Sequence, residues 1–149
     1  MTGLWVALAA VLVALAFGGY RAVVDGRFRG RHRVCGAAPV EVPQETTWDQ
    51  LAEAVREAEP GERATLVQFS TAFCAPCRAT RRVLADVAEA TAGVRHVEVD
   101  AEHHLDVVRR LGIVRTPTTI VLDATGREIA RAAGLPRREQ VVSALALIE

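Results

Sequence analysis

The stretch Phe73-Cys74-Ala75-Pro76-Cys77-Arg78 decides how the rest of the chain is interpreted. An apolar run at 64–69 leads into it and a run with helical spacing at 79–92 leads out, so the cysteines lie where a strand ends and a helix begins. Their spacing places both sulfur atoms within bonding reach on one helical turn. Pro76 suits the first turn, where its missing N–H costs no hydrogen bond. We therefore predict a redox-active pair at a helix N-terminus.

The two cysteines have different expected roles. The sulfur of Cys74 faces the free N–H groups of the first helical turn, where the helix dipole favours negative charge. We expect the pKa of its thiol to lie below that of a free cysteine. An exposed Cys74 thiolate attacks disulfides, and a more sheltered Cys77 resolves the mixed disulfide. Cys74 and Cys77 are the candidate catalytic residues.

A zinc site is one alternative interpretation of the pair, because Cys-x-x-Cys also supplies half of many tetrahedral sites. Such a site needs a second pair of ligands. Cys35 stands alone, and His103 and His104 are adjacent rather than separated by a ligand spacing. An inert structural pair is the other alternative. The sequence favours redox chemistry, with neither a metal nor a bound cofactor.

Length and composition allow one domain of ordinary size with an extension, since the chain has 149 residues. The 18 basic and 18 acidic residues balance, so the total charge gives no indication of nucleic-acid binding. Three cysteines are too few for a disulfide scaffold. The domain must fold by burying a core.

The first 21 residues have the pattern of a membrane anchor. Residues 3–20 contain no charge, and Trp5 and Tyr20 stand near the two ends, where aromatic belts lie. At about 1.5 Å per helical residue the run reaches roughly 27 Å, close to a hydrocarbon core of about 30 Å. A cleaved signal peptide is the main alternative, but no charged side chain precedes the run. We expect a retained transmembrane helix.

Five arginines follow the anchor in a basic linker at 22–43 and its flank: Arg21, Arg27, Arg29, Arg31 and Arg33. The positive-inside rule places this side of the membrane in the cytoplasm. The linker has glycines and prolines and no sustained period, so we interpret it as a tether. Cys35 lies within it, either as a bystander thiol, an intermolecular disulfide partner or a lipidation site.

The remaining residues, 44–149, have the pattern of an α/β domain. Thr47 and Gln50 form a candidate capping box for a first helix that ends before Pro60. The following segments are expected to be a strand, the Cys-x-x-Cys helix, a strand, a short helix, two hairpin strands and a last helix, at 64–69, 75–92, 94–99, 105–111, 118–122, 127–132 and from 136. This order predicts a mixed sheet with helices on both faces.

This domain resembles thioredoxins from about residue 42 to residue 148. Phe73-Cys74-Ala75-Pro76-Cys77 is similar to the family's Trp-Cys-Gly-Pro-Cys, and Gly112-Ile113-Val114-Arg115-Thr116-Pro117-Thr118 is similar to its Gly-Ile-x-x-x-Pro-Thr. The resemblance implies a cis Thr116–Pro117 bond opposite the cysteines, in a groove with Phe73 and Pro76 that binds a peptide in strand fashion. Gly134 also matches a family glycine near this groove.

Three positions depart from the family pattern. Phe73 replaces the tryptophan before the first cysteine, and Ala75 replaces a glycine. Gln68 stands where the family has a buried aspartate that manages the proton of the second cysteine. Glutamine does not ionise, so the group that takes the Cys77 proton is an open question. The proton-transfer candidates are Gln68 and Glu98, and the alternative for Gln68 is a hydrogen-bonded core residue. His96 stands where the family often has a lysine, and we interpret it as an ordinary surface histidine.

The resemblance implies a thiol–disulfide oxidoreductase that reduces protein disulfides and receives electrons from a partner reductase or a membrane donor. With the apolar run at 3–20, we expect it to be tethered to a membrane. A cytoplasmic domain would work as a reductant, because the cytosolic poise keeps dithiols reduced. Two alternatives remain open. One is an extracytoplasmic thiol protein for disulfide formation or cytochrome maturation. The other is a binding module that uses the thioredoxin groove without turnover.

Overall fold

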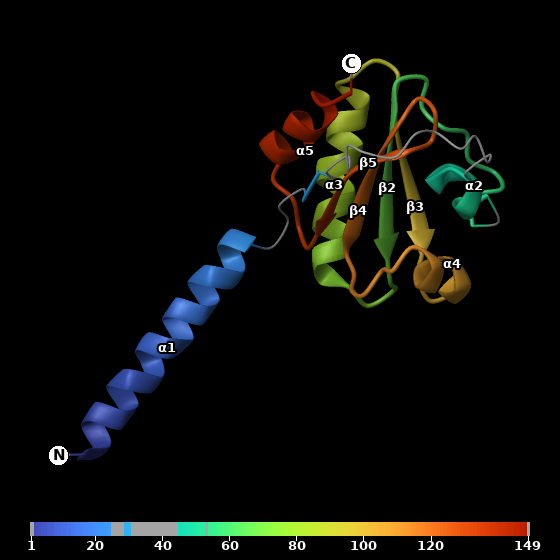
Figure 1. Cartoon of the computed structure of the whole chain (residues 1–149). Coiled ribbons are helices and arrows are strands. Elements are labelled where there is room, and N and C mark those ends of the chain that lie inside the picture. The colour runs from blue at the N-terminus through green and yellow to red at the C-terminus, as the bar shows by residue number, and fades with distance from the viewer. Residues whose placement is uncertain (1, 25–28, 31–44, 53, 149) are drawn as a thin grey trace, which may run out of the picture.

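A computed structural model describes residues 2–24, 29–30, 45–52 and 54–148. Figure 1 shows a helix, α1 (Thr2–Val24), that projects from an α/β domain. The domain contains β1 (Arg29–Gly30), α2 (Thr47–Leu51), β2 (Ala64–Ser70), α3 (Ala75–Glu89), β3 (Val94–Asp100), α4 (Leu105–Arg110), β4 (Thr118–Asp123), β5 (Glu128–Ala133) and α5 (Arg138–Leu145). From α2 to α5 the order is the one that the sequence predicts.

The sheet has the strand order β1-β5-β4-β2-β3. β2 pairs with β3 in parallel, through the crossover helix α3, and with β4 in antiparallel fashion. β4 and β5 form an antiparallel hairpin. The predicted mixed sheet is therefore present, and β2 lies between the strands that carry Glu98 and Thr119.

Two layers of helices cover the sheet, with α3 and α5 on one face and α2 and α4 on the other (Figure 1). Side chains alternate along β2, so Leu66 packs under α3 and α5 while Val67 and Phe69 pack on the α2 and α4 side. Every residue of β2 is buried. Burial on both faces explains why this strand reads as a nearly continuous apolar run.

The start of α2 differs from the sequence prediction by one residue. The cap is Thr46 rather than Thr47: its hydroxyl accepts from the Asp49 N–H at 3.2 Å, and the Asp49 carboxylate accepts from the Thr46 N–H at 2.8 Å. Aspartate three residues after the cap closes this box as well as glutamine does. The Thr46 hydroxyl also donates to the Asp49 carboxylate at 2.7 Å. This bond and the one from the Thr46 N–H hold the pKa of the Asp49 carboxyl below its ordinary value. α2 itself ends at Leu51, well before the predicted limit near Pro60.

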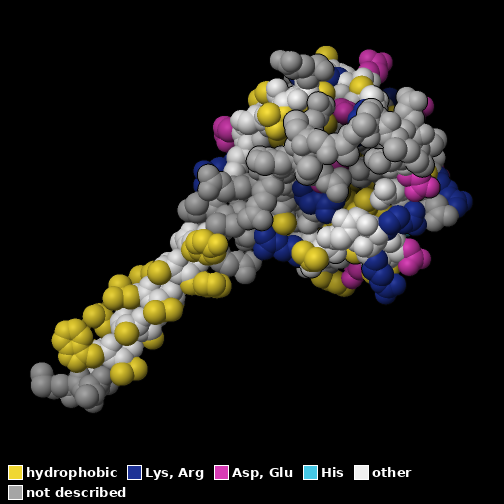
Figure 2. Space-filling view, viewed as in Figure 1, with side chains coloured by type: hydrophobic (Ala, Val, Ile, Leu, Met, Phe, Trp, Pro, Cys, Tyr) yellow, Lys and Arg dark blue, Asp and Glu magenta, His cyan; other side chains and the backbone are white. Residues whose placement is uncertain are grey.

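The side chains of α1 that the structure describes, at 4–20, are all exposed, so none of them is buried against another described part of the chain. Figure 2 shows hydrophobic side chains along this helix. Among the described residues, however, no helix is both long and apolar enough to cross a membrane. The side chains of the five arginines and Cys35 lie outside the described residues.

A short strand interrupts the segment that the sequence assigns to a tether. β1 pairs with β5 in antiparallel fashion, with Arg29 opposite Arg131 and Gly30 opposite Ala130. Two residues are too few for a recognisable period, so this strand could not be predicted from the sequence pattern. Its pairing extends the sheet by one strand at the β5 edge.

Candidate functional site

Cys74 and Cys77 form a disulfide at the N-terminus of α3, with their Cα atoms 5.2 Å apart. Cys74 is the N-cap residue, and its sulfur lies 3.1 Å from the Cys77 backbone nitrogen, which donates to it. Pro76 occupies the first helical turn, as the sequence predicts. Cys77 is only 2% exposed, whereas Cys74 is partly exposed. The geometry matches the expected pairing of an accessible sulfur with a sheltered one.

The Thr116–Pro117 peptide bond is cis, as the resemblance implies. Pro117 is buried at the entrance to β4, and Thr116 is half-buried, with its hydroxyl 3.4 Å from that of Thr71 at the end of β2. The Gly134 N–H donates to the Pro117 carbonyl at 2.8 Å, and Gly134 has a φ of 97°, a conformation that side chains rarely allow. Gly134 thus ties the end of β5 to the cis-proline turn.

Large apolar side chains are open to solvent in the segments that carry the disulfide and the cis-proline turn. Phe73 is 99% exposed, and Val114 in the loop before the cis bond is 90% exposed. Pro76 is also exposed. Large apolar side chains this open to solvent in a folded domain mark interaction surfaces when they gather in one place.

Gln68 lies directly behind the cysteines, with its side chain fully buried. Its Nε2 donates to the Cys77 carbonyl at 3.0 Å, which ties the first turn of α3 to the middle of the sheet. Its Oε1 is buried without a hydrogen-bond partner among the described residues, and so is the hydroxyl of Thr119, the residue opposite it on β4. Gln68 therefore has a structural bond to the helix and one unsatisfied oxygen.

Glu98, the other proton-transfer candidate, is committed to an ion pair. Its Oε1 accepts from Arg81 Nη2 at 2.6 Å and from the Ser70 hydroxyl at 2.5 Å, and its side chain is 28% exposed. Burial raises the pKa of the Glu98 carboxyl, but the bonds from Arg81 and Ser70 outweigh burial and leave that pKa below its ordinary value. Glu98 is therefore ionised at neutral pH and only weakly basic.

A cavity of about 360 Å³ lies beside the disulfide, between the start of α3 and the ends of β2 and β3. Both cysteines line it, together with Ser70, Arg78, Arg81 and Glu98 among others. Sequence reasoning identified Glu98 but missed Ser70 and the arginines. The register of β2 against β3, which puts Glu98 opposite Gln68 and Asp100 opposite Ser70, is the signal that could have brought them together.

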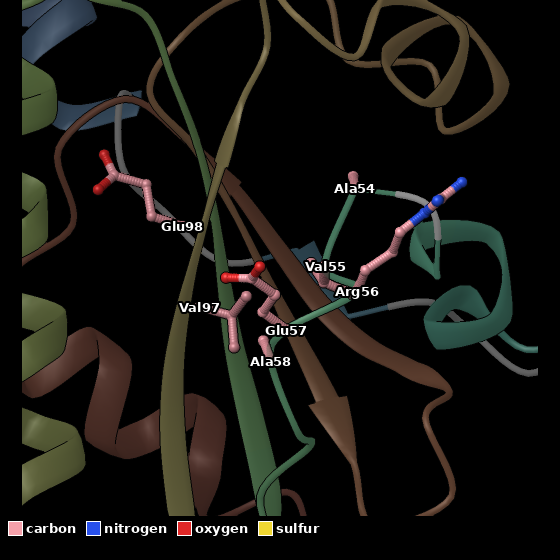
Figure 3. A pocket seen from close by; sticks show the side chains of 7 residues that line it. All are labelled: Ala54, Val55, Arg56, Glu57, Ala58, Val97 and Glu98. Atoms are coloured by element: carbon pink, nitrogen blue, oxygen red, sulfur yellow. The ribbon is translucent and has the colours of Figure 1, made fainter.

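A second cavity, of about 430 Å³, lies between β3 and the segment 54–58. Figure 3 shows that its polar side chains do not converge: Glu98 projects from the face of β3 opposite Val97, and Arg56 points away from both. No cysteine lines this cavity. It offers no arrangement of groups for redox chemistry.

His96 is not the surface residue that the sequence suggested. It is half-buried on the face of β3 next to α3, and its Nε2 is buried without a partner among the described residues. Burial lowers the pKa of its imidazole, although Glu98 pulls that pKa upward. The described part of the chain holds no cluster of three or more histidine, cysteine or carboxylate ligands for a metal ion.

The chain is similar to known proteins over the domain that carries the Cys74–Cys77 pair. The model of the thioredoxin-like domain family matches residues 51–149. The chain belongs to the thioredoxin family. It is 32% identical over 92 residues to thioredoxin from Alicyclobacillus acidocaldarius subsp. acidocaldarius, covering 61% of this chain and 87% of that protein. It is 27% identical over 103 residues to thioredoxin H2-1 of Oryza sativa subsp. japonica, covering 69% and 72% respectively.

Solved structures support the thioredoxin fold. A mutant thioredoxin from Halobacterium salinarum superposes with a TM-score of 0.54 at 19% identity, over 59% of this chain and 77% of that one. Mitochondrial thioredoxin 3 from Saccharomyces cerevisiae gives a TM-score of 0.50, also at 19% identity, over 57% and 78%. With the paired cysteines of this thioredoxin-like domain, family membership makes the protein a thiol–disulfide oxidoreductase.

Proposed function

We propose that the protein is a reductase of protein disulfides, with Cys74 as the nucleophile and Cys77 as the resolving thiol. The observation that carries the proposal is the bond from the Cys77 N–H to the Cys74 sulfur at the start of α3. A thiolate at that position gains from this donor and from the helix dipole. In the dithiol form Cys74 attacks a substrate disulfide, and Cys77 then attacks the Cys74 sulfur and releases the reduced substrate.

The groove for the substrate peptide lies between the disulfide and the cis-proline turn. Thr116 and Pro117 supply the backbone against which an extended peptide pairs, in the manner of an added strand. Phe73 and Pro76 supply apolar contact area, and their exposure supports that role. Partners are thus protein disulfides and, for turnover, a reductase or membrane donor that returns two electrons to the Cys74–Cys77 disulfide.

Replacing Cys77 by serine tests turnover directly. In that variant Cys74 still attacks, but nothing resolves the mixed disulfide, so we expect covalent complexes with substrate proteins to accumulate. Non-reducing electrophoresis and mass spectrometry after expression in cells detect them. Cys35→Ser in the same background should leave their yield unchanged. A Cys77→Ser protein that traps nothing would favour the alternative of a binding module without turnover.

The membrane location is also a proposal. We propose that α1 tethers the domain to a membrane and that the domain lies on the cytoplasmic side. The support is the uncharged run at 3–20 and the exposure of every described side chain at 4–20. Exposed apolar helices of this length are otherwise costly in water, at about 25 cal/mol per Å² of apolar surface. The arginines from Arg21 to Arg33 support the orientation through the positive-inside rule.

The orientation is tested with reporters at the C-terminus. A fluorescent protein that matures in the cytoplasm should be active there, and alkaline phosphatase, which needs an oxidising compartment, should be inactive. Replacing the five arginines by glutamine should scramble the result, because the positive charges set the orientation. An active phosphatase fusion on the wild-type chain would instead support the extracytoplasmic alternative. Recovery of the protein in the soluble fraction after lysis would contradict the tether.

A further inference from the structure

The cavity beside the disulfide extends toward β3 and adjoins the peptide groove at Thr71, whose hydroxyl lies 3.4 Å from that of Thr116. β2 has β4, with the cis-proline turn, on one side and β3 on the other. The cavity is lined from the β3 side, by Glu98 and Asp100, and from α3, and no residue of the cis-proline turn lines it. Its volume of about 360 Å³ falls in the range of small-molecule sites, which is roughly 300–1,000 Å³.

The carboxylates of this cavity already have their partners. Glu98 accepts from Arg81 and Ser70. Asp100 accepts from the Glu102 N–H at 2.8 Å, and its other oxygen lies 2.8 Å from His103 Nδ1. The bond with His103 is the main reason why the pKa of the Asp100 carboxyl lies below its ordinary value. A ligand cation would have to compete with these donors.

The arginines of the cavity have donors to spare. Arg78 is exposed and forms no hydrogen bond or ion pair with another described residue. Arg81 bonds Glu98 through one nitrogen, its side chain is 54% exposed, and a guanidinium has five N–H donors. These N–H donors suit an anion with two acceptor oxygens in one plane, and a carboxylate has this geometry.

We propose that this cavity binds the carboxylate of a low-molecular-weight disulfide, and that the protein reduces small anionic disulfides in preference to neutral ones. The proposal rests on the proposed function, since it needs Cys74 as the nucleophile. A carboxylate held by Arg78 and Arg81 places the attached disulfide next to both cysteines. Folded protein substrates, by contrast, meet the apolar surface around Phe73.

The reaction is balanced with a dithiol protein and one small disulfide. The Cys74 thiolate attacks one sulfur of the ligand, the ligand S–S bond breaks, and the first small thiol leaves as a thiolate that takes a proton from water. Cys77 then loses its proton and attacks the Cys74 sulfur, which releases the second small thiol and forms the Cys74–Cys77 disulfide. Two electrons pass from the protein to the ligand, and a dithiol reductant restores the protein.

The test compares the rate of a single turnover with three disulfides of similar size. The protein is reduced with dithiothreitol, freed of reductant and mixed with dithiodipropionate, hydroxyethyl disulfide or cystamine, which carry two negative charges, none and two positive charges. Acid quenching, alkylation and mass spectrometry give the fraction oxidised. Free mercaptoethanol, a thiol without a cavity, gives the intrinsic reactivity of each disulfide. Relative to this reference, we expect the wild-type protein to prefer the dianion to the neutral disulfide.

Arg78→Gln is expected to lower that preference by about fivefold, which is roughly what one well-placed, partly exposed charge pair contributes. The ratio of two rates in one variant cancels any change in the reactivity of Cys74. Arg82→Gln is the matched control: it removes the same charge one turn further along α3, outside the cavity. It should leave the ratio unchanged. Added salt should lower the wild-type ratio, because partly exposed charges are screened.

Two results would overturn the proposal. The first is a wild-type ratio equal to that of mercaptoethanol, with all disulfides reduced. The second is an equal effect of Arg78→Gln and Arg82→Gln, which would mean a general field rather than a binding site. If none of the three disulfides oxidises the reduced protein, the proposed function itself fails. If hydroxyethyl disulfide, the neutral one, still reacts but the preference for the dianion is absent, only the proposed role of the cavity fails.

Discussion

Replacing Cys74 by serine is expected to abolish disulfide reduction, down to the rate of the buffer alone. A serine hydroxyl keeps its proton at neutral pH and forms no mixed disulfide, so the first step of the reaction is lost rather than slowed. The remaining Cys77 does not substitute for Cys74, because it is 2% exposed beneath the first turn of α3. The measurement is the reduction of a protein disulfide substrate with dithiothreitol as the electron source.

The same geometry makes Cys74 the faster thiol in the reduced wild-type protein. Alkylation at several pH values, followed by peptide mapping, should label Cys74 before Cys77, and the midpoint for Cys74 should lie below that of a free cysteine. Cys35→Ser should have full activity. Faster labelling of Cys77 at neutral pH would contradict the assignment of Cys74 as the nucleophile, whatever the activity of the Cys74→Ser variant.

The elements from β2 to α5 could be predicted because each has a strong local signal. β2 is buried on both faces and reads as an apolar run, and the helix that follows has a proline at its start and a clear apolar face with Leu84 and Val87. The cis bond at Pro117 was expected from the resemblance of residues 112–118 to a thioredoxin motif. The cysteine pair was identifiable because it depends on residues within one short segment. A signal contained in one segment can be recognised without knowing which distant segments pack against it.

The features that escaped prediction depend on weaker or longer-range information. The helix cap fell one residue early because Thr46 and Thr47 are adjacent and only the backbone decides which one caps. β1 has no pattern of its own, since its pairing with β5 alone makes it a strand. The cavity beside the disulfide joins side chains from α3, β2 and β3. No single segment of the sequence carries such a juxtaposition.

Gln68→Asp is expected to destabilise the protein and to change how Cys77 loses its proton. Gln68 donates through Nε2 to the Cys77 carbonyl, and its side chain is completely buried. An ionised aspartate has no donor for that carbonyl. Burial of an unpaired polar group costs about 1–3 kcal/mol on mutational scales, so we expect a loss of this order in the free energy of unfolding.

The loss should depend on pH. Burial raises the pKa of the introduced carboxyl above its value in the unfolded chain. The variant therefore keeps most of its stability below the unfolded pKa of about 3.9, where the acid is protonated in both states. Stability falls as the pH rises from there through the raised pKa of the folded state. Urea unfolding from pH 4 to pH 8 measures this, relative to Gln68→Asn, which has the same shortened side chain without the charge.

The effect on chemistry follows from the same carboxyl group. Resolution of the mixed disulfide needs Cys77 as a thiolate, and a buried thiol holds its proton because desolvation disfavours the charge. Glu98 is a weak base here, since Arg81 and Ser70 hold its pKa low. An aspartate at position 68 with a raised pKa is a better acceptor, so we expect Gln68→Asp to release a bound substrate thiol faster than Gln68→Asn at neutral pH. Single-turnover release from a preformed mixed disulfide measures the rate. Equal rates in the two variants would mean that water or Glu98 already takes the proton, and Gln68 would then serve only to bond the Cys77 carbonyl and hold α3 on the sheet.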